Sequence, residues 1–251
     1  VRKRRQSARM RRENIEVAGR RVEHLRLERE GPPLVLLHGA GANAEVWRPV
    51  CAKTHGFEIA EQLGWRLPKH TVLPVAGGTI LPKVWKAYQE FIELGLVEDN
   101  KPAMYGAQAS GCNPIAKAVE EGHDLFHPQK PDTIAKSIAI GNPADGYYVI
   151  QHLKESGGYA ASATDPEILA AVRLLAETEG IFTETAGGVT VGVTKKLIEQ
   201  GRIKPDESTV ICITGNGLKT LEALEGKFEM PTVIEPNIQS FEEMYSNLAT
   251  V

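Results

Sequence analysis

Thr71-Val-Leu-Pro-Val-Ala-Gly-Gly-Thr-Ile-Leu-Pro-Lys83 is the stretch that decides the fold of this chain. A β-branched, apolar run ends in a turn of small residues, and an amphipathic segment follows directly. This pattern predicts a strand, a glycine-rich loop and the first turn of a helix. In such a loop the backbone N–H groups converge on an anion, and the helix dipole adds partial positive charge. An ordinary turn between a strand and a helix has the same pattern, so the loop alone leaves both interpretations open.

The rest of the chain repeats this alternation of strands and helices. Short apolar runs predict strands at 34–37, 72–75, 103–105, 138–140, 160–163 and 209–213. Helical spacing of apolar residues predicts helices at 56–64, 80–96, 115–121, 147–155, 164–179 and 185–201. The alternation predicts an α/β fold in which helices cover both faces of a parallel sheet.

The first 30 residues differ from the rest in charge. They hold eleven Lys or Arg and five Asp or Glu, a net charge of +6, whereas the remainder carries −9. A basic opening is typical of a nucleic-acid arm, but this one has no interleaved aromatic residues. Residues 1–13 are therefore expected to be a disordered basic tail without a nucleic-acid partner. Alternating residues between Ile15 and Leu27, around Ala18-Gly19, predict a two-stranded hairpin.

Composition limits the classes of function. Hydrophobic residues make up 42% of the 251 residues, as in an ordinary globular protein. No apolar run is long enough to cross a bilayer, so no membrane partner is expected. The three cysteines, Cys51, Cys112 and Cys212, are far apart and form no Cys-x-x-Cys pair. They argue for a reducing compartment, by default the cytoplasm, and against a structural metal site.

Residues 14–50 resemble the opening of an α/β-hydrolase. The apolar run Leu34–Leu37 leads into His38-Gly-Ala-Gly41, and in that family this turn helps to form the oxyanion hole. The family also requires a nucleophile elbow, Gly-x-Ser-x-Gly, but Gln108 stands where its first glycine belongs. An esterase of the α/β-hydrolase type is therefore the weaker alternative, and residues 14–55 are expected to form a short, β-rich, hydrolase-like fragment.

Residues 56–251 carry six motifs in the order found in another family. The motifs are EIAEQLGWRLP (58–68), PVAGGTILPKVWKA (74–87), YGAQASGCNPIAKA (105–118), IAIGNPADG (138–146), EGIFTETAGGVT (179–190) and ITGNGLKT (213–220). Together they resemble the carboxyl-terminal part of threonine synthase, a fold-type II enzyme that depends on pyridoxal phosphate (PLP). The resemblance implies a tryptophan synthase β-like fold, incomplete in this chain, and a PLP-binding domain over residues 56–251.

The resemblance also implies roles for individual residues. Ala76, Gly77, Gly78 and Thr79 match the loop that binds the phosphate of PLP through backbone amides and a hydroxyl. Thr214 matches the residue whose hydroxyl meets the pyridine nitrogen, and a neutral partner there suits β- and γ-replacement chemistry. Without the resemblance, the simpler interpretation of Thr214 is a strand-end hydroxyl bonded within its own turn.

Two carboxylates and one missing motif complete the comparison. Glu179 and Glu184 match a segment that lines the cofactor side, although either also reads as a solvated or capping carboxylate. In the family, the Schiff-base lysine lies in an S-F-K-D-R-like segment. No lysine of these 251 residues has that context, so no catalytic residue is assigned.

The resemblance implies a lyase that converts O-phospho-L-homoserine and water to L-threonine and phosphate, with a homo-oligomer as one expected state. The missing lysine motif predicts a truncated or chimeric form with little or no activity. The alternative from a different class is a non-catalytic fusion or interaction protein.

Overall fold

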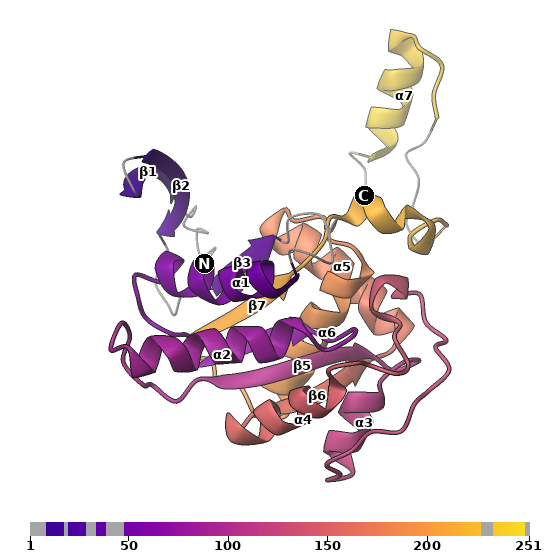
Figure 1. Ribbon diagram of the computed structural model, residues 1–251. Coiled ribbons are helices and arrows are strands. Elements are labelled where there is room, and N and C mark those ends of the chain that lie inside the picture. The colour runs from indigo at the N-terminus through magenta and orange to yellow at the C-terminus, as the bar shows by residue number, and fades with distance from the viewer. Residues whose placement is uncertain (1–8, 18–19, 29–33, 39–47, 227–232, 249–251) are drawn as a thin grey trace. The chain divides into compact units, whose positions relative to one another are not determined.

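The computed structural model describes residues 9–17, 20–28, 34–38, 48–226 and 233–248 (Figure 1). The strands are β1 (Arg9–Val17), β2 (Arg20–Glu28), β3 (Leu34–His38), β4 (His70–Pro74), β5 (Ala103–Ala109), β6 (Tyr159–Ala163) and β7 (Thr209–Ile213). The α-helices are α1 (Arg48–Gln62), α2 (Ile80–Glu93), α3 (Pro114–Glu120), α4 (Gly146–Glu155), α5 (Asp165–Glu179), α6 (Thr185–Glu199) and α7 (Ile238–Leu248). Two 3₁₀ helices are η1 (Lys136–Ile138) and η2 (Gly217–Ala223). Contacts divide the chain into two compact units, Val1–Lys219 and Thr220–Val251.

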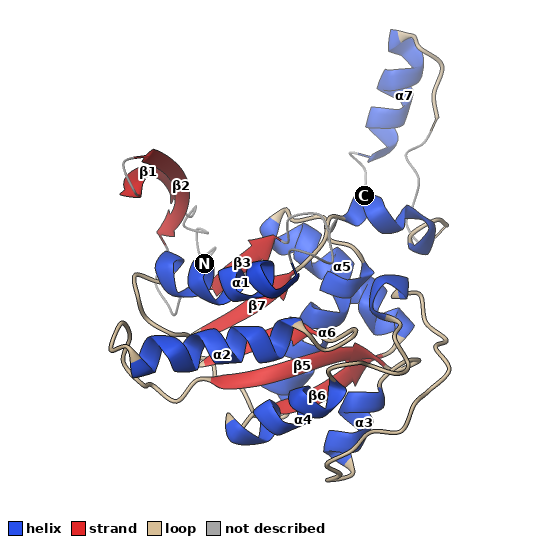
Figure 2. Cartoon of the chain, in the orientation of Figure 1, coloured by secondary structure: helices blue, strands red, loops and turns tan. Residues whose placement is uncertain are grey.

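The first unit is built on a five-stranded sheet with the order β3-β7-β4-β5-β6 (Figure 2). All four neighbouring pairs are parallel, so the predicted parallel α/β architecture is confirmed. β4, β5 and β6 lie side by side in chain order. The next strand, β7, returns to the opposite side of β4 and pairs with it and with β3.

Helices cover both faces of this sheet because alternate strand residues point to opposite sides. In β4, Leu73 packs in a core with buried residues of α1, α2, α3 and α4. Its neighbour Val72 packs in a second core with α6 and with Ile168 of α5. Successive residues of one strand therefore stabilise two different layers of helices.

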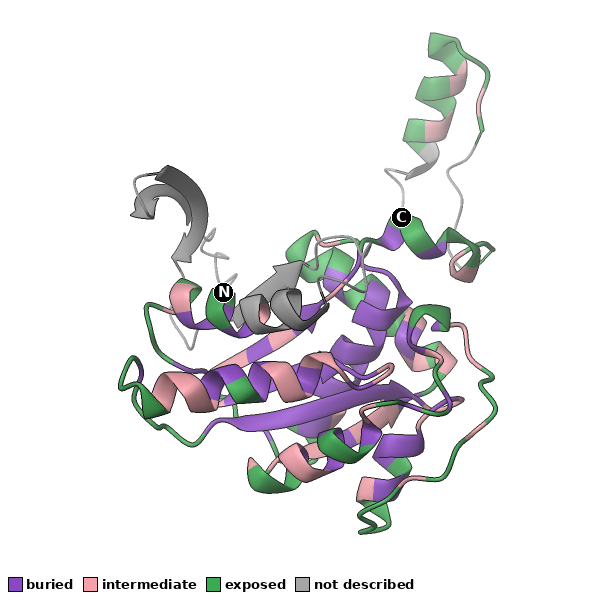
Figure 3. Cartoon of the chain, in the orientation of Figure 1, coloured by how far each residue is buried: buried purple, intermediate pink, exposed green. Residues whose placement is uncertain are grey.

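The centre of the unit is β5 together with α6. Every residue of β5 is buried, as Figure 3 shows along the length of the strand. In α6, residues 185–194 are all buried, which is the pattern of a helix enclosed on every side. Small residues allow this close approach: a Cβ added to Gly188 would lie 2.6 Å from Val172 Cγ2 of α5.

Two predictions about local structure are wrong. Residues 138–140 form no strand, because the chain there turns through η1, with Ala139 N donating to Lys136 O at 3.3 Å. Only Ile138 enters the core, whereas Ile140 is 40% exposed. Residues 9–13, predicted to belong to a disordered tail, lie in β1; residues 1–8 are outside the described part of the chain.

The predicted hairpin is confirmed, since β1 and β2 pair antiparallel with Val17 opposite Arg20. Its expected turn, Ala18-Gly19, lies outside the described residues, as does most of the hydrolase-like turn, which begins at His38, the last residue of β3. Helix α1 crosses residues 55 and 56, where the sequence suggests a domain boundary; the division into 1–13, 14–55 and 56–251 stays a prediction.

The second unit, Thr220–Val251, contains α7. The rings of Phe241 and Tyr245 stack on one side of this helix, with their centroids 6.0 Å apart, and both residues are exposed. Across the residues described in both units, no helix combines the length and the apolar composition needed to span a membrane.

Candidate functional site

The strand order reverses beside β4, and this places the candidate site. From β4 the chain proceeds to β5 on one side, whereas β7 lies on the other side. In open α/β sheets, ligands bind outside the carboxyl ends of the strands at such a reversal. The loop Val75–Thr79 follows β4, and the turn Thr214–Gly217 follows β7. Because these two strands are adjacent and parallel, both predicted parts of the cofactor site lie at the carboxyl ends of the strands.

The loop after β4 has free backbone donors. Val75 N still donates to Ala107 O of β5 at 2.9 Å. In the described part of the chain, no backbone or side-chain group accepts a hydrogen bond from the amide of Ala76, Gly77, Gly78 or Thr79. Four consecutive unpaired amides directly precede the first turn of α2, whose own N–H groups are also free of helical partners. This arrangement fits an anion such as a phosphate group.

The two glycines of the loop have different reasons to be glycine. Gly78 has φ of +93°, and a Cβ there would lie 3.0 Å from Val149 Cγ2 and 3.1 Å from the carbonyl carbon of Asp145. Gly77 has an ordinary φ, and the nearest atom to an added Cβ is Ile140 Cδ1 at 3.8 Å. Gly78 is thus required for folding of the loop, whereas Gly77 leaves open space beside the free amides. That open space supports the fit to a phosphate.

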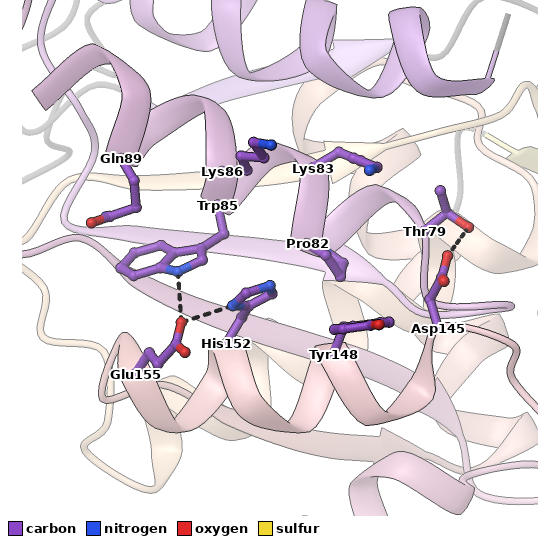
Figure 4. A pocket seen from close by; sticks show the side chains of 10 residues that line it. All are labelled: Thr79, Pro82, Lys83, Trp85, Lys86, Gln89, Asp145, Tyr148, His152 and Glu155. Atoms are coloured by element: carbon purple, nitrogen blue, oxygen red, sulfur yellow. Dashed lines mark hydrogen bonds and ion pairs between the residues drawn. The ribbon is translucent and has the colours of Figure 1, made fainter. Parts of the chain in front are cut away.

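Asp145, at the N-terminus of α4, holds this loop from the side (Figure 4). Its backbone N–H donates to Gly77 O at 2.9 Å, and its Oδ2 accepts a hydrogen bond from Thr79 Oγ1 at 2.6 Å. Asp145 belongs to the motif at 138–146, but the sequence gives no sign that it contacts Thr79. The partner of the predicted phosphate-binding hydroxyl is therefore a finding of the structure.

The turn after β7 is fixed by the segment that begins α6. Glu184 N donates to Gly215 O at 3.1 Å, and Gly217 N donates to Phe182 O at 3.1 Å. The half-buried Thr214 makes no side-chain hydrogen bond to a described residue, so its hydroxyl is available to a ligand. The simpler interpretation, a hydroxyl bonded within its own turn, has no support among the described contacts.

Glu184 lies directly against this turn. The residue is 5% exposed, and a Cβ on Gly215 would fall 1.8 Å from its Oε1. No described residue forms a hydrogen bond or ion pair with its carboxylate. Only glycine at position 215 leaves room for this carboxylate beside Thr214.

The side chain of Gln108 connects the loop after β4 to the start of α3. It is fully buried, and its Oε1 accepts hydrogen bonds from Ile115 N at 2.9 Å and Ala116 N at 3.0 Å, in the first turn of α3. Its Nε2 donates to Val75 O at 3.3 Å. The residue that stands in place of the first glycine of a nucleophile elbow is thus a bridge from the start of α3 to the loop. This role explains the glutamine, which sequence reasoning took only as an absent glycine.

A groove of about 490 Å³ separates α2 from α4 and begins at Thr79 and Asp145. Lys83 and Lys86 of α2 line it, so neither lysine is placed at the turn after β7. At its far end, Glu155 Oε2 lies 2.8 Å from His152 Nδ1 and accepts a hydrogen bond from Trp85 Nε1 at 3.2 Å. The bond to His152 lowers the pKa of Glu155.

The two described thiols, Cys112 and Cys212, are not activated nucleophiles. Burial raises the pKa of the Cys212 thiol, inside β7, to about 12, and it also raises the pKa of Cys112. Thiols held in the neutral form are weak nucleophiles. Among the described residues, no group of three or more His, Cys, Asp or Glu side chains is arranged to hold a metal ion.

Comparisons with known proteins find relatives of this chain in sequence and in fold. A family model described as "Pyridoxal-phosphate dependent enzyme" matches residues 3–215, a range that includes the hydrolase-like segment. Threonine synthase of Methanosarcina acetivorans is 41% identical over 192 residues, 76% of this chain and 47% of that protein. Threonine synthase of Methanocaldococcus jannaschii is 38% identical over 197 residues, 78% of this chain and 48% of that protein. The chain thus spans about half the length of these relatives.

Solved structures match at the level of the fold. An L-serine ammonia-lyase from Rhizomucor miehei has a TM-score of 0.55 at 22% identity, over 74% of this chain and 58% of that one. Maize serine racemase has a TM-score of 0.54 at 18% identity, over 71% of this chain and 54% of that one. At these identities the likeness shows a shared fold and nothing about a shared substrate.

Proposed function

This chain belongs to the pyridoxal-phosphate dependent enzyme family, and we propose that it forms part of a threonine synthase-type lyase. The proposed reaction converts O-phospho-L-homoserine and water to L-threonine and phosphate. Identities of 41% and 38% to two threonine synthases support this choice within the family. Because the chain spans about half of those proteins, we propose that it supplies the phosphate-loop side of a larger active site.

The observation that carries the proposal is the row of free amides at Ala76, Gly77, Gly78 and Thr79. Free donors at the start of a helix attract a phosphate, because their partial charges add to that of the helix dipole. These amides follow β4, and Thr214 follows the adjacent strand β7. The hydroxyl of Thr214 has no described hydrogen-bond partner. A phosphate and a ring nitrogen belonging to one cofactor would meet these two features.

The residues have separate roles in this proposal. The amides of Ala76, Gly77 and Gly78 hold the phosphate of PLP, and the Thr79 hydroxyl adds one donor. Thr214 meets the pyridine nitrogen with a neutral hydroxyl. When bound, PLP supplies an electron sink for substrate carbanions. The protein contributes position and hydrogen bonds, and the helices on both faces exclude water from the sheet.

A second candidate is a protein that binds the cofactor without catalysis. This candidate is favoured because no lysine of these 251 residues lies in an S-F-K-D-R-like segment. Lys83 and Lys86, on the helix that follows the phosphate loop, line the groove between α2 and α4. Both candidates use the same phosphate loop, so binding and turnover must be measured separately.

The first test is binding of PLP to the chain, followed by tryptophan fluorescence, with pyridoxal as the ligand that lacks a phosphate. We expect PLP to bind at least tenfold more tightly than pyridoxal. Gly77→Ala should remove most of this preference, because its Cβ occupies the open space of the loop. Equal binding of the two ligands would contradict the assignment of the loop.

Turnover is tested by supplying O-phospho-L-homoserine with PLP and measuring L-threonine and phosphate. Release of both products in equal amounts by the chain supports the lyase and excludes the binding-only candidate. PLP binding without products supports the binding-only candidate for these 251 residues. Hydrolysis of a simple ester, lost on His38→Ala, is the result that the weaker esterase alternative requires.

The surroundings of the protein follow from the same proposal. We propose a small-molecule substrate, a homo-oligomeric state and a reducing, cytoplasmic location. The two described cysteines, Cys112 and Cys212, are free and buried, as expected for thiols in a reducing compartment. Light scattering of the purified chain measures the oligomeric state directly.

A further inference from the structure

Asp145 forms two hydrogen bonds with the proposed phosphate-binding loop, residues 76–79. Its N–H binds Gly77 O at 2.9 Å, and its carboxylate binds the Thr79 hydroxyl at 2.6 Å. Gly78, between these two points, packs against the backbone of Asp145 so closely that an added Cβ would lie 3.1 Å from its carbonyl carbon. The backbone contact orders the loop, and the side-chain contact fixes the direction of the Thr79 hydroxyl (Figure 4).

The side-chain contact conflicts with phosphate binding. A hydroxyl has one proton, and a carboxylate and a phosphate dianion are both acceptors. Thr79 can therefore donate to Asp145 or to a phosphate, but not to both. A phosphate at the same hydroxyl would also lie roughly 5 Å from the carboxylate, the length of two hydrogen bonds. No described cation forms an ion pair with Asp145, so its charge opposes the phosphate directly.

We propose that Asp145 is a positioning residue that sets the phosphate affinity of this loop, because its carboxylate holds the Thr79 hydroxyl at 2.6 Å and its charge opposes a phosphate bound there. The inference rests on the proposed function of the loop. Asp145 keeps the loop in its receptive shape while no ligand is bound. The same carboxylate then limits how tightly a phosphorylated ligand is held, which allows the ligand to be exchanged.

The substitution Asp145→Asn separates shape from charge. The amide oxygen of asparagine still accepts the Thr79 hydrogen bond, and the backbone bond to Gly77 is unaffected. Only the negative charge is removed. Two like charges about 5 Å apart weaken binding about fourfold at the dielectric constant of bulk water, and more strongly near a protein surface, so Asp145→Asn should tighten binding by at least about fourfold.

The experiment measures the dissociation constants of inorganic phosphate, PLP and pyridoxal for wild type and Asp145→Asn by equilibrium dialysis. We expect phosphate and PLP to bind at least about fourfold more tightly to the variant, and pyridoxal to bind equally to both. In a Thr79→Val background the gain should persist to within about threefold, because Asp145→Asn removes the charge and leaves competition for the hydroxyl unchanged. Glu155→Gln is the matched control: it removes a carboxylate of the same helix and groove, and phosphate affinity should stay within twofold.

Each outcome decides between the alternatives. Unchanged or weaker phosphate binding by Asp145→Asn, with unfolding in urea like that of wild type, overturns the inference. PLP binding by wild type without a gain in the variant overturns the inference and leaves the proposed function standing. A gain for phosphate without a preference for PLP over pyridoxal supports the inference and contradicts the proposed function. If Asp145→Asn does not fold, Asp145→Ser, which removes the charge and keeps a polar side chain at this position, is compared with wild type in the same way.

Discussion

The Nε2 atom of His70 lies 2.8 Å from Oε2 of Glu207, and this pair joins the start of β4 to the segment before β7. It lies at the amino ends of these strands, at the opposite end of β4 from the candidate phosphate-binding loop. The side chain of His70 is 5% exposed and that of Glu207 is 25% exposed. The hydrogen bond from His70 lowers the pKa of Glu207, so the carboxylate is held in its charged form. The pair fixes two adjacent strands whose carboxyl ends form the candidate site.

We expect Glu207→Gln to lower the free energy of unfolding at pH 7 by about 1 kcal/mol, the usual contribution of such a bond. Because the pKa of Glu207 is lower in the folded state, the stabilisation is complete above its unfolded pKa of about 4.3. It is lost as the pH falls through the folded value. Urea unfolding at pH 7 and pH 3 measures the difference, which should be smaller at pH 3. Glu199→Gln, at the exposed end of α6, serves as control, and a Glu207 effect that grows in acid would contradict this account.

Gln108→Glu should destabilise the protein by about 2 to 4 kcal/mol at pH 7. One carboxylate oxygen still accepts from the first turn of α3, but the other faces the carbonyl oxygen of Val75 without a proton, in a fully buried position. Protonation restores the donor, so we expect the loss to shrink as the pH falls from 7 to 5. Gln89→Glu, at a half-buried position of α2 in the groove, should show neither effect in thermal unfolding. A pH-independent loss would indicate a packing defect instead.

Glu167, at the start of α5, should give a further pH dependence of stability. Burial acts to raise the pKa of Glu167, but hydrogen bonds from Lys196 and Thr164 outweigh it and lower the pKa to about 2. Its contribution is therefore complete above the unfolded pKa of about 4.3 and is lost as the pH falls towards 2. The melting temperature of Glu167→Gln should lie below that of wild type at pH 6 and equal it near pH 2. Glu177→Gln, whose partner Arg173 lies on the same helix surface, should change little at either pH.

The two loop glycines should respond differently to alanine. Gly78→Ala forces a side chain into a φ of +93° and against Asp145 and Val149, so we expect a loss of about 1 to 3 kcal/mol in the free energy of unfolding. Gly77→Ala should unfold within about 0.5 kcal/mol of wild type but lose phosphate binding. Urea unfolding and phosphate dialysis on both variants test this. Equal stability losses at the two positions would show that both glycines serve the turn alone.

Much of the fold follows from local sequence signals. Thr164, Pro166 and Glu167 predict the start of α5, and Gly180, with φ of +70°, ends it as expected. The strand at 209–213 is also confirmed as β7. The prediction of a strand at 138–140 is wrong. A run of three apolar residues does not indicate whether a neighbouring strand is available to pair with it.

The site is predicted less completely than the fold. The motifs indicate the glycine loop and Thr214, which follow the adjacent strands β4 and β7; their roles in binding a cofactor stay a prediction. Asp145 and Gln108 could not be found in this way. Their contacts with Thr79 and Val75 join residues 66 and 33 positions apart, and nothing in a local pattern specifies such pairs.

The place of β7 in the sheet has a consequence for synthesis of the protein on the ribosome. This strand lies between β3 and β4, yet it is the last of the five to be made. His70 must wait for a partner 137 residues later, while β4, β5 and β6 can already pair. Until residues 209–213 emerge, one edge of β4 is exposed and β3 has no neighbour in the sheet. While residues 75–213 are being synthesised, the nascent chain therefore presents an open strand edge, and this is the stage at which chaperones protect such edges.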